Sequence, residues 1–149
     1  MGSIWSQTCS IGRRPPLRGH LKTQAAVVGA GMAGVLTAYA LQQAGLSVVV
    51  LEADRIAGGQ TQNTTAKITS QHGLIYSRLI QSFGEETARR YAKANQDAVR
   101  AYQDLIDVQG ISCDWEERCA YLYGPDVTVL QEEAEAARRL GLPASFTRE

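Results

Sequence analysis

The chain has 149 residues, of which 44% are hydrophobic and 20% are charged. This composition is ordinary for a globular domain, but the length is short for a two-domain enzyme. The 15 basic and 15 acidic side chains give no net charge, so nothing in the composition indicates a nucleic-acid partner or an anionic membrane surface.

Residues 1–23 are expected to form a leader segment on the surface of the domain that follows. The beginning of the chain lacks a positively charged start followed by a long apolar core, so it does not resemble a secretory signal. Arg13 and Arg14 precede Pro15 and Pro16, and two consecutive prolines favour an extended backbone.

Residues 24–74 are predicted to form a Rossmann-like nucleotide-binding unit. A short apolar run ends at Val28, and the glycine-rich corner from Gly29 to Gly34 follows it. A helical pattern comes next, and a second apolar run ends at Glu52. A G-x-G-x-x-G sequence between a strand and a helix, with an acidic residue about 20 positions later, is typical of dinucleotide binding.

Each residue of this pattern has a physical role. Gly29 permits a tight turn, Gly31 lets a pyrophosphate approach the backbone, and Gly34 lets the helix pack closely on the strand. The helix N-terminus offers free N–H groups and partial positive charge to a phosphate. Glu52 can accept hydrogen bonds from both hydroxyls of an adenosine ribose and would repel a 2′-phosphate, which argues against NADP.

The uncharged run from Thr23 to Leu51 also has the hydropathy of a membrane span. Four glycines and the pair Gln42-Gln43 interrupt that run. Val48–Val50 is instead interpreted as a parallel strand that is apolar because both of its faces are covered. No integral membrane segment is therefore expected.

Small and hydroxyl-bearing residues dominate the segment from Gly58 to Ser70. An ordinary polar surface loop would have this composition. A backbone laid along an extended ligand would have it too, with Gly58 and Gly59 allowing close approach and threonine hydroxyls donating hydrogen bonds. Composition alone leaves both interpretations open.

The glycine corner, Glu52 and the run from Arg55 to Lys67 together resemble the start of the D-amino-acid oxidase and glycine oxidase family of FAD-dependent oxidoreductases. The sequence from Thr64 to Gly73 is most similar to gamma-glutamylputrescine oxidase-like proteins, which often carry a C-terminal Rieske iron–sulfur domain. The resemblance extends from about Pro15 to the end of the chain.

The resemblance implies that FAD is the cofactor and that twelve residues bind it. Met32 and Ala33 would donate backbone N–H groups to the pyrophosphate, Glu52 would bind the adenosine ribose, and Ala53 would lie beside the adenine. The full set is Gly29, Gly31, Met32, Ala33, Gly34, Glu52, Ala53, Gln60, Thr61, Thr65, Ala66 and Lys67.

The same resemblance assigns the flavin end of the cofactor to the later residues of that set. Gln60 and Thr61 would lie along the phosphate and ribityl portion, and the stretch from Thr65 to Lys67 would approach the isoalloxazine ring. The family often has a basic residue where Gln60 stands. His72 is interpreted as a loop histidine rather than as a covalent attachment point for the flavin. No catalytic residue is assigned.

Residues 75–149 are predicted to begin a helical, α+β substrate-domain insertion. Apolar residues recur at helical spacing from Glu85 to Gln109, with a capping box starting at Ser82 and a stop at Gly110. The tyrosines of this helix are interpreted as core residues rather than as a substrate site.

A second helix is predicted from Thr128 to Leu140, capped by Thr128 and Gln131. Its acidic residues at positions 132, 133 and 135 suit the helix dipole and are interpreted as needing no further function. Short strands are expected at residues 113–116 and 120–123.

The three cysteines are odd in number and lack metal-ligand spacing, so no metal site is expected. The prediction is reduced thiols in a cytoplasmic protein.

The fold predicted for the whole chain is α/β, with an incomplete parallel sheet whose apolar edges stay exposed. The predicted function is the N-terminal FAD-binding part of an oxidoreductase of the amine or amino-acid oxidase type, whose flavin accepts a hydride from a C–N bond of a small amine or amino-acid substrate. This part alone is not expected to be catalytically complete. A NAD-dependent dehydrogenase and a truncated, non-catalytic nucleotide-binding fragment remain the alternatives.

Overall fold

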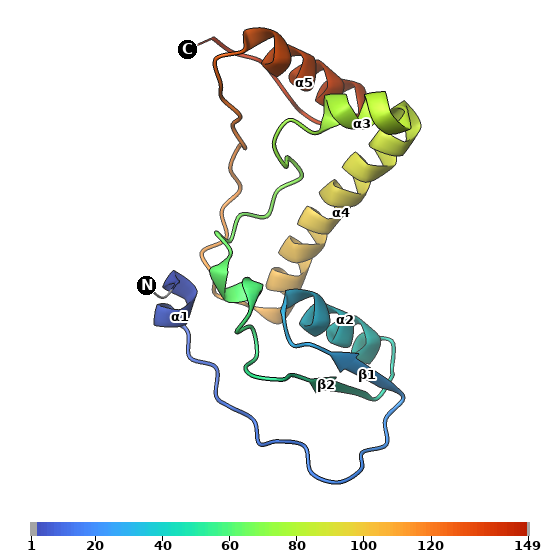
Figure 1. Cartoon of the computed structure of the whole chain (residues 1–149), viewed down its shortest axis with the longest axis vertical. Helices are drawn as coiled ribbons and strands as arrows, with labels where there is room; N and C mark the ends of the chain where they lie inside the picture. Colours follow the sequence, from blue (N-terminus) through green and yellow to red (C-terminus); the bar gives the residue numbers. More distant parts are fainter. Residues whose placement is uncertain (1–2, 149) are drawn as a thin grey trace. The chain divides into compact units, whose positions relative to one another are not determined.

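The computed structural model describes residues 3–148 and is drawn in Figure 1. The chain divides into two compact units, one up to Lys67 and the other from Ile68 onward. The first unit contains a parallel sheet with one helix on it, and the second contains three helices. The predicted α/β class with an incomplete parallel sheet is confirmed.

The first unit is built on a β–α–β motif (Figure 1). Strands β1 (Ala25–Val28) and β2 (Val48–Leu51) pair in parallel, with Ala25 opposite Val48 and Val28 opposite Leu51. Helix α2 (Met32–Gln43) connects the strands and packs on both. Both strands and the helix therefore form where the alternation of apolar runs and glycines predicted them.

The two-stranded sheet leaves apolar side chains in contact with solvent. Val28 is 85% exposed and Val50 is 37% exposed. Exposed apolar residues were expected at the edges of an incomplete sheet, but the expectation that β2 is covered on both faces is wrong for Val50. Parallel strands are buried on both faces only where helices or further strands cover the sheet.

The leader segment begins with a short helix that the sequence did not predict, α1 (Ile4–Thr8), and continues without regular structure to Thr23. The indole N–H of Trp5 donates a hydrogen bond to the Thr64 carbonyl at 2.8 Å. The Thr23 hydroxyl donates to the Ser47 carbonyl at 2.7 Å. The leader is therefore attached to the rest of the first unit near both of its ends.

The second unit contains α3 (Tyr76–Phe83), α4 (Glu85–Gln109) and α5 (Val127–Arg139). The predicted helix from Glu85 to Gln109 is confirmed, including its end at Gly110, which has a left-handed backbone with φ of 60°. The predicted capping box is wrong. Ser82 lies inside α3, and Gly84, with φ of 79°, separates the two helices.

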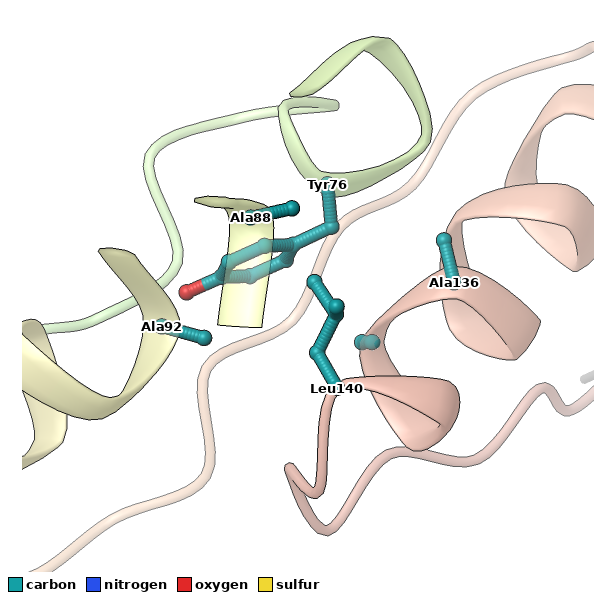
Figure 2. Packing of buried hydrophobic residues seen from close by; sticks show 6 residues of the cluster. Tyr76, Ala88, Ala92, Ala136 and Leu140 are labelled. Carbon is teal, nitrogen blue, oxygen red and sulfur yellow. The ribbon is translucent and has the colours of Figure 1, made fainter. Parts of the chain in front are cut away.

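Tyr76 lies at the centre of the core of the second unit, among four small or aliphatic side chains (Figure 2). Its ring is fully buried, and its hydroxyl donates to the Ser70 carbonyl. Tyr91 packs on this core with its ring edge-on to Tyr76, at a centroid distance of 6.4 Å. The core assignment of Tyr91 is confirmed. The labelled neighbours are Ala88, Ala92, Ala136 and Leu140.

Glu133 joins α5 to the beginning of α3. Its carboxylate is buried, with 4% exposed, and accepts backbone hydrogen bonds from Ile75, Tyr76 and Ser77 at 2.9–3.0 Å. The Gln71 side-chain amide donates a fourth hydrogen bond at 2.9 Å. The first N–H groups of a helix lack partners within the helix, and here a carboxylate from another helix accepts them. The interpretation that Glu133 needs no function beyond the dipole of its own helix is therefore wrong.

The start of α5 and the segment before it also differ from prediction. Asp126 caps the helix, since its carboxylate accepts the Val129 N–H at 3.2 Å, so the cap predicted at Thr128 is wrong. Residues 113–116 and 120–123 form no strand. A strand needs a neighbour to pair with, and the sheet pairs only β1 with β2 within residues 3–148.

Replacing Asp126 with alanine should lower the free energy of unfolding of the second unit by about 1 kcal/mol, because the Val129 N–H loses its acceptor. The measurement is urea denaturation followed by circular dichroism. Thr128→Ala is the matched control and should leave the free energy of unfolding within about 0.5 kcal/mol of the original value. A larger loss in Thr128→Ala than in Asp126→Ala would contradict this assignment of the cap.

No helix among residues 3–148 combines the length and the apolar character needed to cross a membrane.

Candidate nucleotide-binding site

The glycine corner lies between the end of β1 and the start of α2. Gly29 has φ of 101°, a left-handed conformation that favours glycine, and its N–H donates to the Leu51 carbonyl at 2.7 Å. A Cβ atom at Gly34 would lie 1.9 Å from the Gly29 carbonyl oxygen. The close approach of α2 to β1 therefore requires glycine at position 34, as predicted.

Gly31 differs from its two neighbours in the motif, because the fold itself does not require a glycine there. Its backbone is extended, with φ of −76° and ψ of −178°. The nearest atom to a Cβ built at this position is the Thr61 hydroxyl oxygen, at an ordinary contact distance of 3.4 Å. The absence of a side chain leaves space at the N-terminus of α2, which is where a phosphate is favoured.

Glu52 follows β2 directly and is hydrogen-bonded to the glycine corner. One carboxylate oxygen accepts the Ala30 N–H at 2.7 Å, and the other accepts the Asp54 N–H at 3.0 Å. These hydrogen bonds, the one from Ala30 first, hold the pKa of Glu52 below its ordinary value, so the exposed side chain is ionised at neutral pH. An ionised carboxylate has about four acceptor positions, which leaves capacity for two ribose hydroxyls.

The loop after β2 returns to the corner. The Ala57 N–H donates to the Ala30 carbonyl at 2.9 Å, and Ala57 has a left-handed backbone with φ of 57°. Gln62 stabilises this loop, since its amide donates to the Gly58 carbonyl and its oxygen accepts from the Arg55 guanidinium at 3.0 Å. Periodicity gave no indication of this role for Ala30 and Gln62.

The short 3₁₀ helix η1 (Gln60–Asn63) brings Thr61 to the first turn of α2. The Thr61 hydroxyl accepts the Met32 N–H at 2.9 Å. Two residues assigned to the cofactor by resemblance, 29 positions apart in the chain, are therefore in direct contact. A phosphate bound at this N–H would share or replace the Thr61 contact.

The remaining residues assigned to the cofactor are exposed. Ala33 lies in the first turn of α2, and Ala53 follows Glu52. Gln60 begins η1, and the stretch from Thr65 to Lys67 ends the first unit, with Ala66 in a left-handed conformation at φ of 56°. Such a backbone is strained for alanine.

His72 belongs to the second unit, where its Nε2 lies 3.3 Å from the Asn95 side-chain oxygen.

A cavity of about 260 Å³ lies beside the end of β2. Its lining includes Leu51, Glu52, Ala30 and Ile56, and also residues of the leader. This cavity was not predicted, because its lining combines the leader with the β–α–β motif, and these parts are separate in the chain.

The corner and its surroundings fit the diphosphate and ribose of a dinucleotide. Position 31 has room for an approaching phosphate, and Gly34 lets the helix N-terminus lie close to β1. Glu52 presents an ionised carboxylate next to the same corner. These features suit FAD and NAD equally, because the two cofactors share the ADP group.

Comparison with known proteins identifies the family of the chain. The family model described as FAD dependent oxidoreductase matches residues 24–149. Among curated relatives, YhfW of Bacillus subtilis, described as a Rieske 2Fe-2S iron–sulfur protein, is 36% identical over 94% of this chain and 28% of its own length. The gamma-glutamylputrescine oxidoreductase of Escherichia coli is 28% identical over 77% of this chain and 28% of its own length.

A third relative is the bifunctional protein MnmC of Ectopseudomonas mendocina, named for tRNA 5-methylaminomethyl-2-thiouridine biosynthesis. It is 33% identical over 88% of this chain and 21% of its own length. The chain thus spans between about a fifth and three tenths of the length of these relatives. No solved structure matches the chain. Because the family model covers everything from Gln24 onward, the chain belongs to the family of FAD-dependent oxidoreductases that its glycine corner, Glu52 and following loop predicted.

Proposed function

We propose that this chain is the FAD-binding part of an oxidoreductase that acts on a small amine or amino acid. In enzymes of this type, FAD accepts a hydride from the carbon that carries the amine. The observation that carries the proposal is the contact between Glu52 and the glycine corner in a chain that belongs to the family. The substrate class is supported by the name of the Escherichia coli relative, which identifies gamma-glutamylputrescine.

In this proposal the residues of the chain bind and orient the cofactor. The N–H groups of Met32 and Ala33 receive the pyrophosphate, and Gly31 gives it access to the backbone. Glu52 holds the ribose hydroxyls, with Ala53 beside the adenine. The remaining residues of the expected set, Gln60, Thr61, Thr65, Ala66 and Lys67, line the path toward the flavin ring.

We also infer the class of partner and the cellular location. The balanced charge of the chain supports a small-molecule substrate rather than a nucleic acid. We therefore do not propose tRNA as a partner, although the name of the Ectopseudomonas relative contains it. The free, exposed thiols of Cys9, Cys113 and Cys119 support a reducing compartment, and we propose that the protein is cytoplasmic.

Parallel titrations with FAD and with NAD test this function. The protein should bind FAD, acquire the yellow colour of a flavoprotein, and bind NAD at least about 10-fold more weakly. Calorimetry and flavin absorption would measure both affinities. Tighter binding of NAD would favour a nicotinamide-dependent dehydrogenase, and a protein that takes up neither cofactor would overturn the proposal.

A further inference from the structure

The cavity beside β2 has a wall that comes from outside the β–α–β motif. Leader residues Arg14, Pro15 and Leu17 line it together with Glu52 and Ile56. The resemblance assigned no ligand contact to any residue before Gly29. The leader therefore lines the cavity although no ligand contact has been assigned to it.

The chemistry of the cavity suits a nucleoside. Most of its lining is apolar, including Pro15, Leu17 and Ile56, and its charged groups are Arg14 and Glu52. Apolar walls accept a flat aromatic ring, a guanidinium can stack on such a ring, and a carboxylate accepts hydrogen bonds from ribose hydroxyls. The volume of about 260 Å³ is below the range of about 300–1,000 Å³ found for complete ligand sites, so it suits one part of a dinucleotide.

The leader is held near the cavity by contacts at both of its ends. Trp5 donates to the Thr64 carbonyl, and Thr23 donates to the Ser47 carbonyl. Helix α1 also packs on η1. A segment fixed at both ends has less conformational freedom to lose when a ligand binds, so the wall that it forms is partly preorganised.

We propose that the leader is part of the cofactor site and encloses the adenosine end of FAD. Pro15 and Leu17 pack on the adenine, the Arg14 guanidinium stacks on the same ring, and Glu52 binds the ribose. This inference rests on the proposed function, since it requires a ligand that carries adenosine. It adds residues of the leader to the site and assigns them the adenosine end of the ligand.

ADP is the probe for this proposal, because it carries the adenosine and diphosphate without the flavin. The double variant Arg14→Ala/Leu17→Ala should bind ADP and FAD about 10-fold more weakly than the original protein in calorimetric titrations. Arg18→Ala/Leu21→Ala is the matched control, since both of its residues belong to the leader but not to the cavity lining. Leu17 and Leu21 are almost equally exposed, at 57% and 55%. The control should bind both ligands like the original protein.

Limited trypsin digestion of the unmodified protein gives an independent result. Bound ADP should slow cleavage after Arg18 several-fold, as followed by mass spectrometry, because the leader closes over the ligand. Unchanged affinities in Arg14→Ala/Leu17→Ala, or equal losses of affinity in both double variants, would overturn the inference without contradicting the proposal that the original protein binds FAD. An unchanged cleavage rate at saturating ADP would overturn it as well. Failure of the original protein to bind FAD or ADP would instead refute the proposed function.

Discussion

Gly34→Ala should disrupt the first unit and abolish FAD binding. A methyl group at this position would lie 1.9 Å from the Gly29 carbonyl oxygen, far inside any real contact distance. The backbone fixes the position of the Cβ atom, and the oxygen is itself a backbone atom, so no side-chain rotation can relieve the clash. Helix α2 must move off β1, which we expect to cost about 3 kcal/mol of unfolding free energy. Thermal denaturation and FAD titration would measure the two losses.

Gly31→Ala adds the same methyl group three positions earlier and serves as the control for stability. Its Cβ would meet only the Thr61 hydroxyl at 3.4 Å, and its backbone angles are open to any residue. We expect a change of less than about 0.5 kcal/mol in unfolding free energy. Equal stability of the two variants would show that α2 does not pack on β1 as described.

Glu133→Ala should have the largest effect on the second unit. The substitution removes the acceptor of three backbone N–H groups at the start of α3 and of the Gln71 amide, and these groups lie in a part-buried or buried environment. Buried donors without partners are costly, and we expect a loss of about 3–5 kcal/mol. Urea denaturation would measure it, and hydrogen exchange should show faster exchange at Ile75, Tyr76 and Ser77.

Two further variants distinguish the loss of the Glu133 hydrogen bonds from the loss of a negative charge on α5 as the cause of a change in stability. Glu132→Ala removes a neighbouring exposed carboxylate and should change the stability by less than about 0.5 kcal/mol. Glu133→Gln keeps one carbonyl oxygen as an acceptor, so its stability should lie between that of Glu133→Ala and that of the original protein. If Glu133→Ala is no less stable than Glu132→Ala, then α5 does not cap α3.

The parts of the fold that follow from local chemistry were predictable. The turn at Gly29 and the packing at Gly34 depend on backbone geometry within a few residues, so the G-x-G-x-x-G spacing identifies them. The end of α4 at Gly110 follows in the same way from a left-handed glycine. The family was also predictable, because its residues are concentrated in one continuous stretch.

Contacts between distant residues were not predictable from spacing. Glu133 lies 58 positions from Ile75, and the nearby carboxylates of Glu132 and Glu135 are exposed, so nothing local distinguishes it from them. Helix α3 was missed because it spans eight residues and only Gly84 separates it from α4. The contact of Thr61 with Met32 depends on the path of the loop after β2, which composition alone left open.

Binding of FAD by the unmodified protein and by Gly31→Val, compared by equilibrium dialysis, tests the central claim most directly. The claim is that the absence of a side chain at Gly31 admits the diphosphate to the start of α2. We expect the valine variant to keep its helical circular dichroism and to bind FAD at least about 100-fold more weakly, a difference of about 2.7 kcal/mol. Equal affinity of the two proteins for FAD would contradict the claim.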